Sequence, residues 1–355
     1  MIDIPIQRAA TSKPRTPDAA LGFGQYFTDH MFLMDFHAGR GWHDARIQPY
    51  GPLSLDPAAS VLQYAQTLFD GLKAIRGVDG KIRLFRPDRH AARLAHGVER
   101  MCMPTIAADI VQQAMTELVK LEHEWVPSSP NTALYLRPTI IGTEPFLGVR
   151  PSREFIFFVI ASPVGAYYAE GFNPVSIWIE DECVRAPRGG LGAVKAGANY
   201  AASLYAADRA KKHGFAQVLW LDAAEHKYLE EVGTMNLFVE IDGVFRTPAL
   251  EGSILAGVTR SSIITLLRDW GKEVVEGPIA VAEIEDAHAR GKLDEVFGTG
   301  TAAVISSVGE LGHGEKRMVI NDKKPGPMAL RIFDELTGIQ QGRIADTRGW
   351  TVTVG

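Results

Sequence analysis

Cysteine is almost absent from the 355 residues of this chain, which contains only Cys102 and Cys183. The two stand far apart and form no CxxC pair, so neither a disulfide framework nor a thiolate metal site is expected. The ten histidines form no HExxH pair, and we expect no metal centre. This pattern is typical of a protein of the reducing cytoplasm.

Long apolar runs and blocks of like charge are missing as well. The strongest apolar stretch, FIFFVIA at 155–161, is too short to span a bilayer, and residues 1–20 lack the apolar core of a signal peptide. The formal charge of -5 is spread along the chain without basic blocks. We therefore expect neither a membrane nor nucleic acid as partner and favour small molecules.

The composition that remains is ordinary for a globular protein, with 46% hydrophobic and 22% charged residues and enough length for about two domains. We interpret residues 1–20 as a loosely ordered arm. Helical periodicity covers 58–69, and two strands flank a turn at 78–80. A helix capped by Asp88, a longer helix at 108–125 and strands at 132–141 and 153–164 complete one mixed α+β unit.

Small and turn-forming residues at 165–174 mark the best candidate linker, after which a second unit begins. The elements predicted in this unit are a strand at 174–180, a helix ending at Gly214, a strand at 216–222, a hairpin at 237–248 that turns at Asp242 and Gly243, and helices at 259–271 and 281–291.

One lysine stands in an unusual setting. Lys195 lies in GGLGAVKAGANY, residues 189–200, and the nearest preceding acid, Glu182, is well upstream. A lysine in a loop of small residues can be desolvated, so that its amine is neutral and nucleophilic, as a Schiff base requires. Glu231 follows in LEEVGTMNLFVEI, directly before a Gly-Thr turn and a strand. Alone, each is more often a solvated surface charge, but together they indicate a pyridoxal 5'-phosphate (PLP) enzyme.

Two glycine-containing turns downstream have the features of phosphate sites. Gly257, Val258 and Thr259 stand where a loop enters a helix, so backbone N–H groups and the positive helix end face an anion. In FGTGTAAVISS, residues 297–307, a tight turn offers the hydroxyls of Thr299 and Thr301. Taken singly, both motifs are more often helix caps and loop turns.

A phosphate also needs a fixed cation. The stretch RLFRPDRHAARL offers four arginines, and the residues alone do not choose among them: Arg83, Arg86, Arg89 and Arg93.

Together, these residues resemble the branched-chain amino acid aminotransferases, which are PLP enzymes of fold type IV, from about Gly22 to the carboxyl terminus. The similar segments include FTDHMF, RIQPY, LFDGLKAIRG, RLFRPD, LYLRPTIIGTEPFLGV, KAGANY, QVLWLD, EVGTMNLF, GVTR and FGTGTA. The resemblance implies an α+β protein with a small N-terminal α/β domain at 21–164, a loop at 165–174 and a larger C-terminal domain at 175–355, barrel-like with helices, that binds PLP.

The resemblance also assigns roles around the cofactor. It makes Lys195 the aldimine lysine, Tyr200 the partner of the phenolic oxygen of PLP and Glu231 the partner of the pyridine nitrogen. The phosphate and the rest of the cofactor are implied to be bound by Arg93, Thr234, Val258, Thr259 and Thr301.

Around the substrate, the resemblance places Phe23, Tyr64, Phe69, Tyr135, Arg137 and Tyr167, with Thr301 and Ala302 at the α-carboxylate. Arg137 is implied to engage the distal carboxylate of glutamate, so that one mostly apolar pocket accepts both substrates. Leu147 and Val149 match residues that reach the site of a neighbouring subunit, which implies a homodimer. For the aromatic residues, core packing is the alternative interpretation.

The activity implied is reversible, ping-pong transfer of an amino group from L-leucine, L-isoleucine or L-valine to 2-oxoglutarate. Alternatives are a D-amino acid aminotransferase, an aminodeoxychorismate lyase, or a protein that binds a phosphate ligand without catalysis. The chain departs from some relatives by having Ala303 and Ser306 where mammalian members have cysteines, so no thiol switch is expected there. Ala198 replaces a glycine before Asn199.

Overall fold

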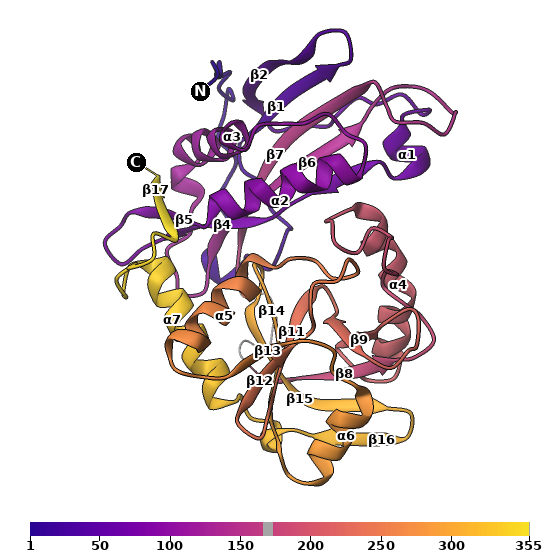
Figure 1. The fold of residues 1–355 in the computed structure, drawn as a ribbon. Coiled ribbons are helices and arrows are strands. Elements are labelled where there is room, and N and C mark those ends of the chain that lie inside the picture. The colour runs from indigo at the N-terminus through magenta and orange to yellow at the C-terminus, as the bar shows by residue number, and fades with distance from the viewer. Residues whose placement is uncertain (166–172, 355) are drawn as a thin grey trace. The chain divides into compact units, whose positions relative to one another are not determined.

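The computed structural model describes residues 1–165 and 173–354, and the chain divides into two compact units (Figure 1). Unit 1 comprises Met1–Ala169, Val194–Ala198 and Thr337–Gly355, and unit 2 comprises Glu170–Ala193 and Asn199–Leu336. The sequence analysis drew a single boundary, at 165–174, whereas these units interleave along the chain. That division into domains stays a prediction.

An antiparallel sheet forms the centre of unit 1, with eight strands among the described residues in the order β17-β5-β4-β6-β7-β1-β2 and β3 paired with β6. Its strands are β1 (His30–His37), β2 (Gly41–Pro49), β3 (Thr67–Phe69), β4 (Leu72–Arg76), β5 (Ile82–Phe85), β6 (Ala133–Gly142), β7 (Glu154–Val164) and β17 (Thr351–Val354). The strands expected on both sides of the 78–80 turn and at 132–141 and 153–164 are confirmed as β4, β5, β6 and β7.

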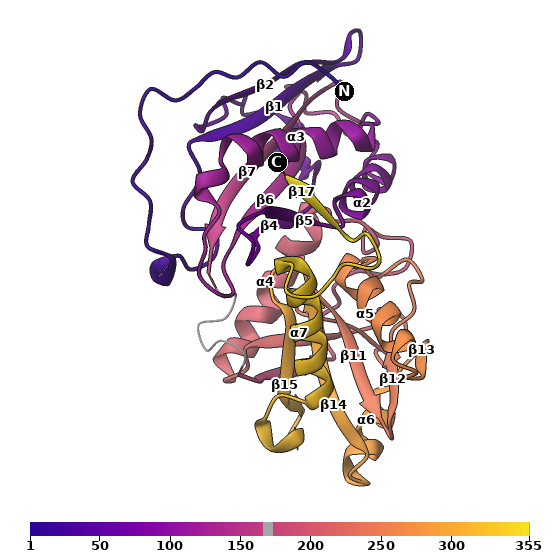
Figure 2. The same cartoon turned by 90° about the vertical axis from the view of Figure 1, so that its left-hand side faces the viewer.

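Two amphipathic helices, α2 (Pro87–Arg100) and α3 (Ala108–Leu121), pack on each other and on this sheet (Figure 2). Their apolar residues recur at helical spacing, and α2 buries Ala91, Leu94 and Val98. The short 3-10 helix η2 (His123–Trp125) continues α3, so the helix predicted for 108–125 is confirmed over most of its length.

Two local predictions in this unit are wrong. The helix expected at 58–69 is only α1 (Ser60–Tyr64), because Ala65 takes a left-handed backbone conformation with φ 51° and Thr67–Phe69 pairs with β6 as β3. A short apolar run fits a helix or a strand, and here its pairing with β6 makes residues 67–69 a strand. Asp88 is not the cap of α2: the helix begins at Pro87 after Arg86, since proline suits a first helical position.

The N-terminal arm is hydrogen-bonded to the rest of unit 1. Ile2 exchanges two hydrogen bonds with the Gln113 side chain, at 2.9 and 2.8 Å, and the backbone N–H of Ala9 donates to Nε2 of the buried His30 at 2.8 Å. These residues are therefore fixed at several points, and the expectation of a loosely ordered arm is wrong for them.

Unit 2 is built on a barrel-like sheet with nine strands among the described residues. They are β8 (Val175–Glu180), β9 (Gln217–Leu221), β10 (Leu229–Val232), β11 (Met235–Ile241), β12 (Val244–Thr247), β13 (Val274–Glu276), β14 (Leu293–Gly300), β15 (Val304–His313) and β16 (Lys316–Val319). Since β10 pairs with both β9 and β11, the strands β10-β9-β8-β15-β14-β11 close on themselves. The predicted α+β class with a barrel-like C-terminal part is confirmed.

Alternating apolar residues of these strands make the core of unit 2, which includes Ile177, Leu219, Leu237, Val239 and Val308. The helices of this part of the chain are α4 (Gly197–Lys212), α5 (Val258–Asp269), α6 (Val281–Ala289) and α7 (Pro327–Gln341). Within α7, the residues from Thr337 onward belong to unit 1.

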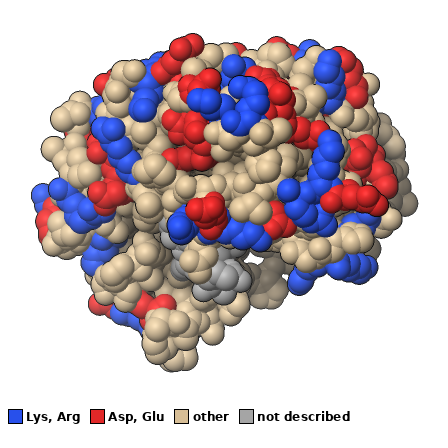
Figure 3. All heavy atoms as spheres, turned by 90° about the horizontal axis from the view of Figure 1, so that it is seen from below, with Lys and Arg blue, Asp and Glu red and all other residues tan. Residues whose placement is uncertain are grey.

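The surface matches the charge pattern of the sequence. Figure 3 shows acidic and basic side chains interspersed on the face that it presents, without a large field of one sign. Among the described residues, every helix is too short or too polar to cross a membrane.

Candidate functional site

The lysine segment belongs to unit 1, although the residues on both sides of it belong to unit 2. Strand β3 holds this segment: the Phe69 N–H donates to the Lys195 carbonyl at 3.1 Å, and Leu68 forms a β-bridge with Ala196. A Cβ on Gly197 would lie 2.6 Å from Cγ2 of Thr67, so glycine permits this close approach. The backbone around Lys195 is thereby fixed.

The Lys195 amine is buried, and burial lowers its pKa from 10.5 to about 8. The Arg93 guanidinium lowers this pKa further, whereas Tyr135 and Asp70 raise it. Its Nζ lies 5.0 Å from the centre of the Phe69 ring. The desolvation expected for this lysine is therefore present, and its role as the nucleophile stays a prediction.

Four of the residues predicted to surround the substrate form one cluster in unit 1. The Phe23 and Tyr135 rings meet edge to face at 5.2 Å. The Arg137 guanidinium lies 4.5 Å from the Phe69 ring centre, and its Nη2 donates to the Tyr135 hydroxyl at 3.2 Å. Because Phe69 also contacts Lys195, this cluster combines apolar walls with one fixed cation next to the lysine.

Tyr64, Leu147 and Val149 form a separate group at the surface of unit 1, with exposed fractions of 44%, 64% and 87%. The Tyr64 hydroxyl donates to the Leu147 carbonyl. Tyr167, also predicted to contact the substrate, lies outside the described residues.

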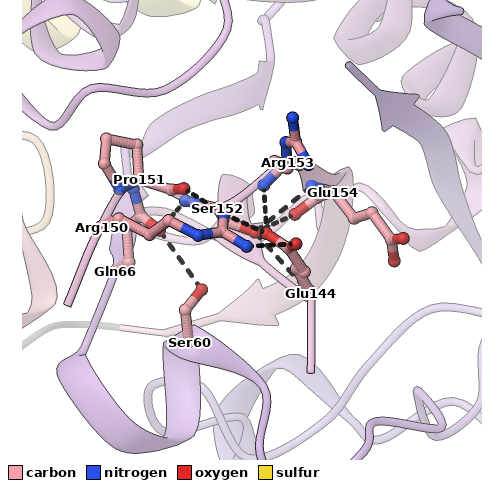
Figure 4. A network of polar contacts seen from close by, with 8 residues as sticks. All are labelled: Ser60, Gln66, Glu144, Arg150, Pro151, Ser152, Arg153 and Glu154. Atoms are coloured by element: carbon pink, nitrogen blue, oxygen red, sulfur yellow. Dashed lines mark hydrogen bonds and ion pairs between the residues drawn. The ribbon is translucent and has the colours of Figure 1, made fainter. Parts of the chain in front are cut away.

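The loop that carries Leu147 and Val149 is held at its base by a polar network (Figure 4). Glu144 accepts two hydrogen bonds from Arg150, at 2.9 and 2.7 Å, and one from the Arg153 N–H at 2.7 Å. The Ser152 N–H donates to Oε1 of Gln66 at 3.2 Å. These hydrogen bonds fix both ends of the loop, while its tip is exposed.

Among the four candidate arginines, Arg93 is the one whose charge acts on Lys195. Its Nε and Nη2 donate to the Asp70 carboxylate at 2.8 and 2.7 Å. The others have different surroundings: Arg83 pairs with Asp79, Arg86 lies over the Trp350 ring, and Arg89 is exposed beside Asp88.

Glu231 is buried in β10 of unit 2, 3% exposed, and opposes Asn236 of β11 across the strand pair. Its Oε1 accepts hydrogen bonds from Asn236 Nδ2 at 3.1 Å and from the Leu255 N–H at 3.0 Å, and its Oε2 lies 2.9 Å from Arg185 Nε. These donors favour the charged carboxylate. The acid is therefore held in one orientation.

The two predicted phosphate turns lie near Asn236. A Cβ on Gly257 would come 1.9 Å from Asn236 Oδ1, which places the start of α5, with Val258 and Thr259, against that residue. Asn236 is also in register with Thr299 of β14. The Thr299 hydroxyl donates to the Val304 carbonyl at 2.8 Å, as expected for the alternative interpretation of this segment as a loop turn.

The remaining predicted residues of unit 2 lie in loops or at an element end. Thr301 and Ala302 form the turn between β14 and β15, Thr234 lies in the turn between β10 and β11, and Tyr200 lies in the first turn of α4.

Three residues that support the site were missed by the sequence analysis: Asp70, Arg185 and Asn236. Asp70 and Asn236 stand in the segments LFDGLK and GTMN, close to residues already predicted for the site. Their position could therefore have identified them. Arg185 had no such signal, because only folding brings it to Glu231.

Each unit carries groups of the kinds that bind a phosphorylated aldehyde cofactor. In unit 1 these are the desolvated amine of Lys195 and the oriented guanidinium of Arg93. In unit 2 they are the buried carboxylate of Glu231 and the N-terminal N–H groups of α5. An amine binds an aldehyde, an arginine and helix N–H groups bind phosphate, and a fixed carboxylate retains a proton on a ring nitrogen.

Comparison with known proteins agrees with this chemistry. The family model for amino-transferase class IV matches residues 67–311. Branched-chain-amino-acid transaminase 1 of Bacillus subtilis (strain 168) is 51% identical over 343 residues, which are 96% of each chain. The chain belongs to the class IV aminotransferases, which depend on PLP.

Solved structures are similar too. The Escherichia coli branched-chain amino acid aminotransferase has a TM-score of 0.77 and 26% identity, with 92% of this chain and 99% of that chain covered. The T.th. branched-chain amino acid aminotransferase, complexed with N-(5'-phosphopyridoxyl)-L-glutamate, has a TM-score of 0.72 and 25% identity, with 91% and 98% covered.

The lowered pKa of Lys195 predicts how its reactivity depends on pH in the enzyme freed of cofactor. Because the neutral amine is the nucleophile, acylation of Lys195 by a trace of acetic anhydride is expected to rise with a midpoint near pH 8, not 10.5. Mass spectrometry of the labelled peptides measures it. In Arg93→Met the midpoint moves up, since a neighbouring positive charge is gone. A midpoint above pH 10 in the unmodified enzyme contradicts the burial argument.

Proposed function

We propose that this class IV aminotransferase transfers the amino group of L-leucine, L-isoleucine or L-valine to 2-oxoglutarate, reversibly and by a ping-pong route. The observation that carries the proposal is the cluster of Phe23, Phe69, Tyr135 and Arg137 beside Lys195. All three proteins named above are branched-chain enzymes, and the T.th. enzyme holds a phosphopyridoxyl group joined to glutamate.

The predicted residues would hold PLP as follows. Lys195 would bind its aldehyde carbon, Arg93 with Val258, Thr259 and Thr301 its phosphate, and Tyr200 its phenolic oxygen. When bound, PLP supplies a ring that withdraws electrons from the α-carbon of the amino acid. The Glu231 carboxylate keeps a proton on the pyridine nitrogen, and its three partners keep it charged and oriented.

The freed amine of Lys195 moves the proton. As a neutral base it would take the proton from the α-carbon of the substrate, and as an acid it would give a proton back. A pKa of about 8 suits both tasks, because the amine then exchanges protons readily near neutral pH.

The cluster beside the lysine accounts for two kinds of substrate. The Phe23, Phe69 and Tyr135 rings present apolar surface to a branched aliphatic side chain. Arg137, which is oriented by the Tyr135 hydroxyl, offers a cation to the distal carboxylate of glutamate. Thr301 and Ala302 would bind the α-carboxylate.

A substrate panel tests the activity. Glutamate formed from 2-oxoglutarate is measured with L- and D-amino acids, and we expect turnover with L-leucine, L-isoleucine and L-valine and loss of activity in Lys195→Ala. That variant also loses the visible absorbance of lysine-bound cofactor. Turnover confined to D-amino acids, or a protein that PLP cannot colour, would overturn the proposal.

The negative charge of Glu231 gives a separate prediction. Glu231→Gln preserves the shape of the side chain but removes the charge, so PLP stays bound while the proton shift slows, on the order of a hundredfold. Single-turnover absorbance with L-leucine measures that step. Glu225→Gln, at an exposed acid of unit 2, is the matched control. An unchanged rate in Glu231→Gln would remove the pyridine role.

We further propose a homodimer in the cytoplasm. A second copy would cover the exposed tip formed by Leu147 and Val149, and the two free cysteines, Cys102 and Cys183, suit a reducing compartment. Cell fractionation tests the location.

The dimer is tested at the tip of the loop. Leu147→Glu would place a charge in the interface, and we expect its sedimentation to shift from dimer to monomer. Val78→Glu, at a turn residue of unit 1 that is 70% exposed, is the control and should stay dimeric. A Leu147→Glu protein that sediments like the unmodified chain contradicts this interface.

A further inference from the structure

Asp70 follows β3 and is 1% exposed, yet no step described above uses it. Its Oδ2 accepts a hydrogen bond from Arg93 Nε at 2.8 Å, and its Oδ1 accepts one from Arg93 Nη2 at 2.7 Å. This two-point pair fixes the plane of the guanidinium as well as its position.

Two further donors hold the Asp70 carboxylate. The Gly71 N–H donates to its Oδ1 at 2.6 Å, and His90 Nδ1 lies 2.8 Å from the same oxygen. Burial lowers the pKa of His90. Burial alone would raise the pKa of Asp70, but Arg93 and His90 hold it well below its usual range. The acid is therefore ionised and immobile.

Both neighbours of Asp70 in the chain contact predicted site residues. The Phe69 N–H holds the Lys195 carbonyl, and a Cβ on Gly71 would lie 1.8 Å from the Tyr135 hydroxyl oxygen. Asp70 thus connects Arg93 of α2 to β3, the strand with which the lysine segment pairs.

We propose that Asp70 is a positioning residue for the cofactor phosphate. By accepting hydrogen bonds from Nε and Nη2 of Arg93, it fixes the orientation of the guanidinium before the cofactor arrives. An arginine without this partner would lose side-chain freedom on binding, which weakens the contact. The inference rests on the proposed function, in which Arg93 binds that phosphate.

The test compares two ligands of the enzyme freed of cofactor. PLP and pyridoxal both combine with Lys195, but pyridoxal lacks the phosphate. Visible absorbance titrations yield a Kd for each, and the ratio of the Kd for pyridoxal to the Kd for PLP reports the phosphate contact alone. A change in the pKa or placement of Lys195 alters both values and cancels in the ratio.

In Asp70→Asn, we expect this ratio to fall about 10- to 100-fold, the range for losing one charge-assisted hydrogen bond. Asp70→Glu keeps the charge but moves it by one methylene, and its ratio falls less. If Asp70→Asn does not fold, Asp70→Glu decides the matter, since a ratio equal to that of the unmodified enzyme overturns the inference.

The control is Asp79→Asn, because Asp79 forms a similar two-point pair with Arg83, at 2.8 and 2.7 Å, in an exposed hairpin. Its ratio should not change. If both affinities fall together in Asp70→Asn and the ratio stays constant, Asp70 only stabilises the fold and the inference is overturned.

Failure of the proposed function gives a different result. An unmodified enzyme that fails to bind PLP, or binds pyridoxal equally well, has no phosphate site at Arg93. An unmodified enzyme that prefers PLP, together with Asp70→Asn at the same ratio, removes only the role of Asp70.

Discussion

Backbone pairing between β3 and the lysine segment is the contact on which the site in unit 1 depends. The Phe69 N–H holds the Lys195 carbonyl, and the next residue, Asp70, holds Arg93. A short stretch of chain therefore places an amine, a guanidinium and an aromatic ring together. Burial then changes the chemistry, because the amine loses its water and becomes nucleophilic near neutral pH.

Much of the fold could be predicted from residue patterns, because long strands and amphipathic helices have clear periods. The strands on both sides of the 78–80 turn and the helices α2 and α3 were predicted from such periods. The prediction for 58–69 was wrong because twelve residues with few polar breaks fit a helix or a strand, and the partner strand β6 decides from far along the chain. Closure of the barrel likewise needs long-range pairs, of β8 with β15 and of β11 with β14.

For the site, sequence motifs located Lys195, Glu231 and the start of α5, since each chemical task requires a particular residue type in a turn or at an element end. They could not select Arg93 from four arginines, because the choice depends on burial beside Asp70. They also could not show that the Thr299 hydroxyl, one of two candidate donors in its turn, bonds to the Val304 carbonyl. A single sequence does not show which side chains from distant segments become partners, because only folding brings them together.

The pairing of β17 with β5 has a consequence for synthesis. Thr351–Val354 covers the outer edge of Ile82–Phe85 in the sheet of unit 1. Until residues 351–354 emerge from the ribosome, the backbone groups on that side of β5 have no strand to pair with. A nascent chain thus carries an open sheet edge from the synthesis of β5 until that of β17, and such an edge is a template for pairing with other chains.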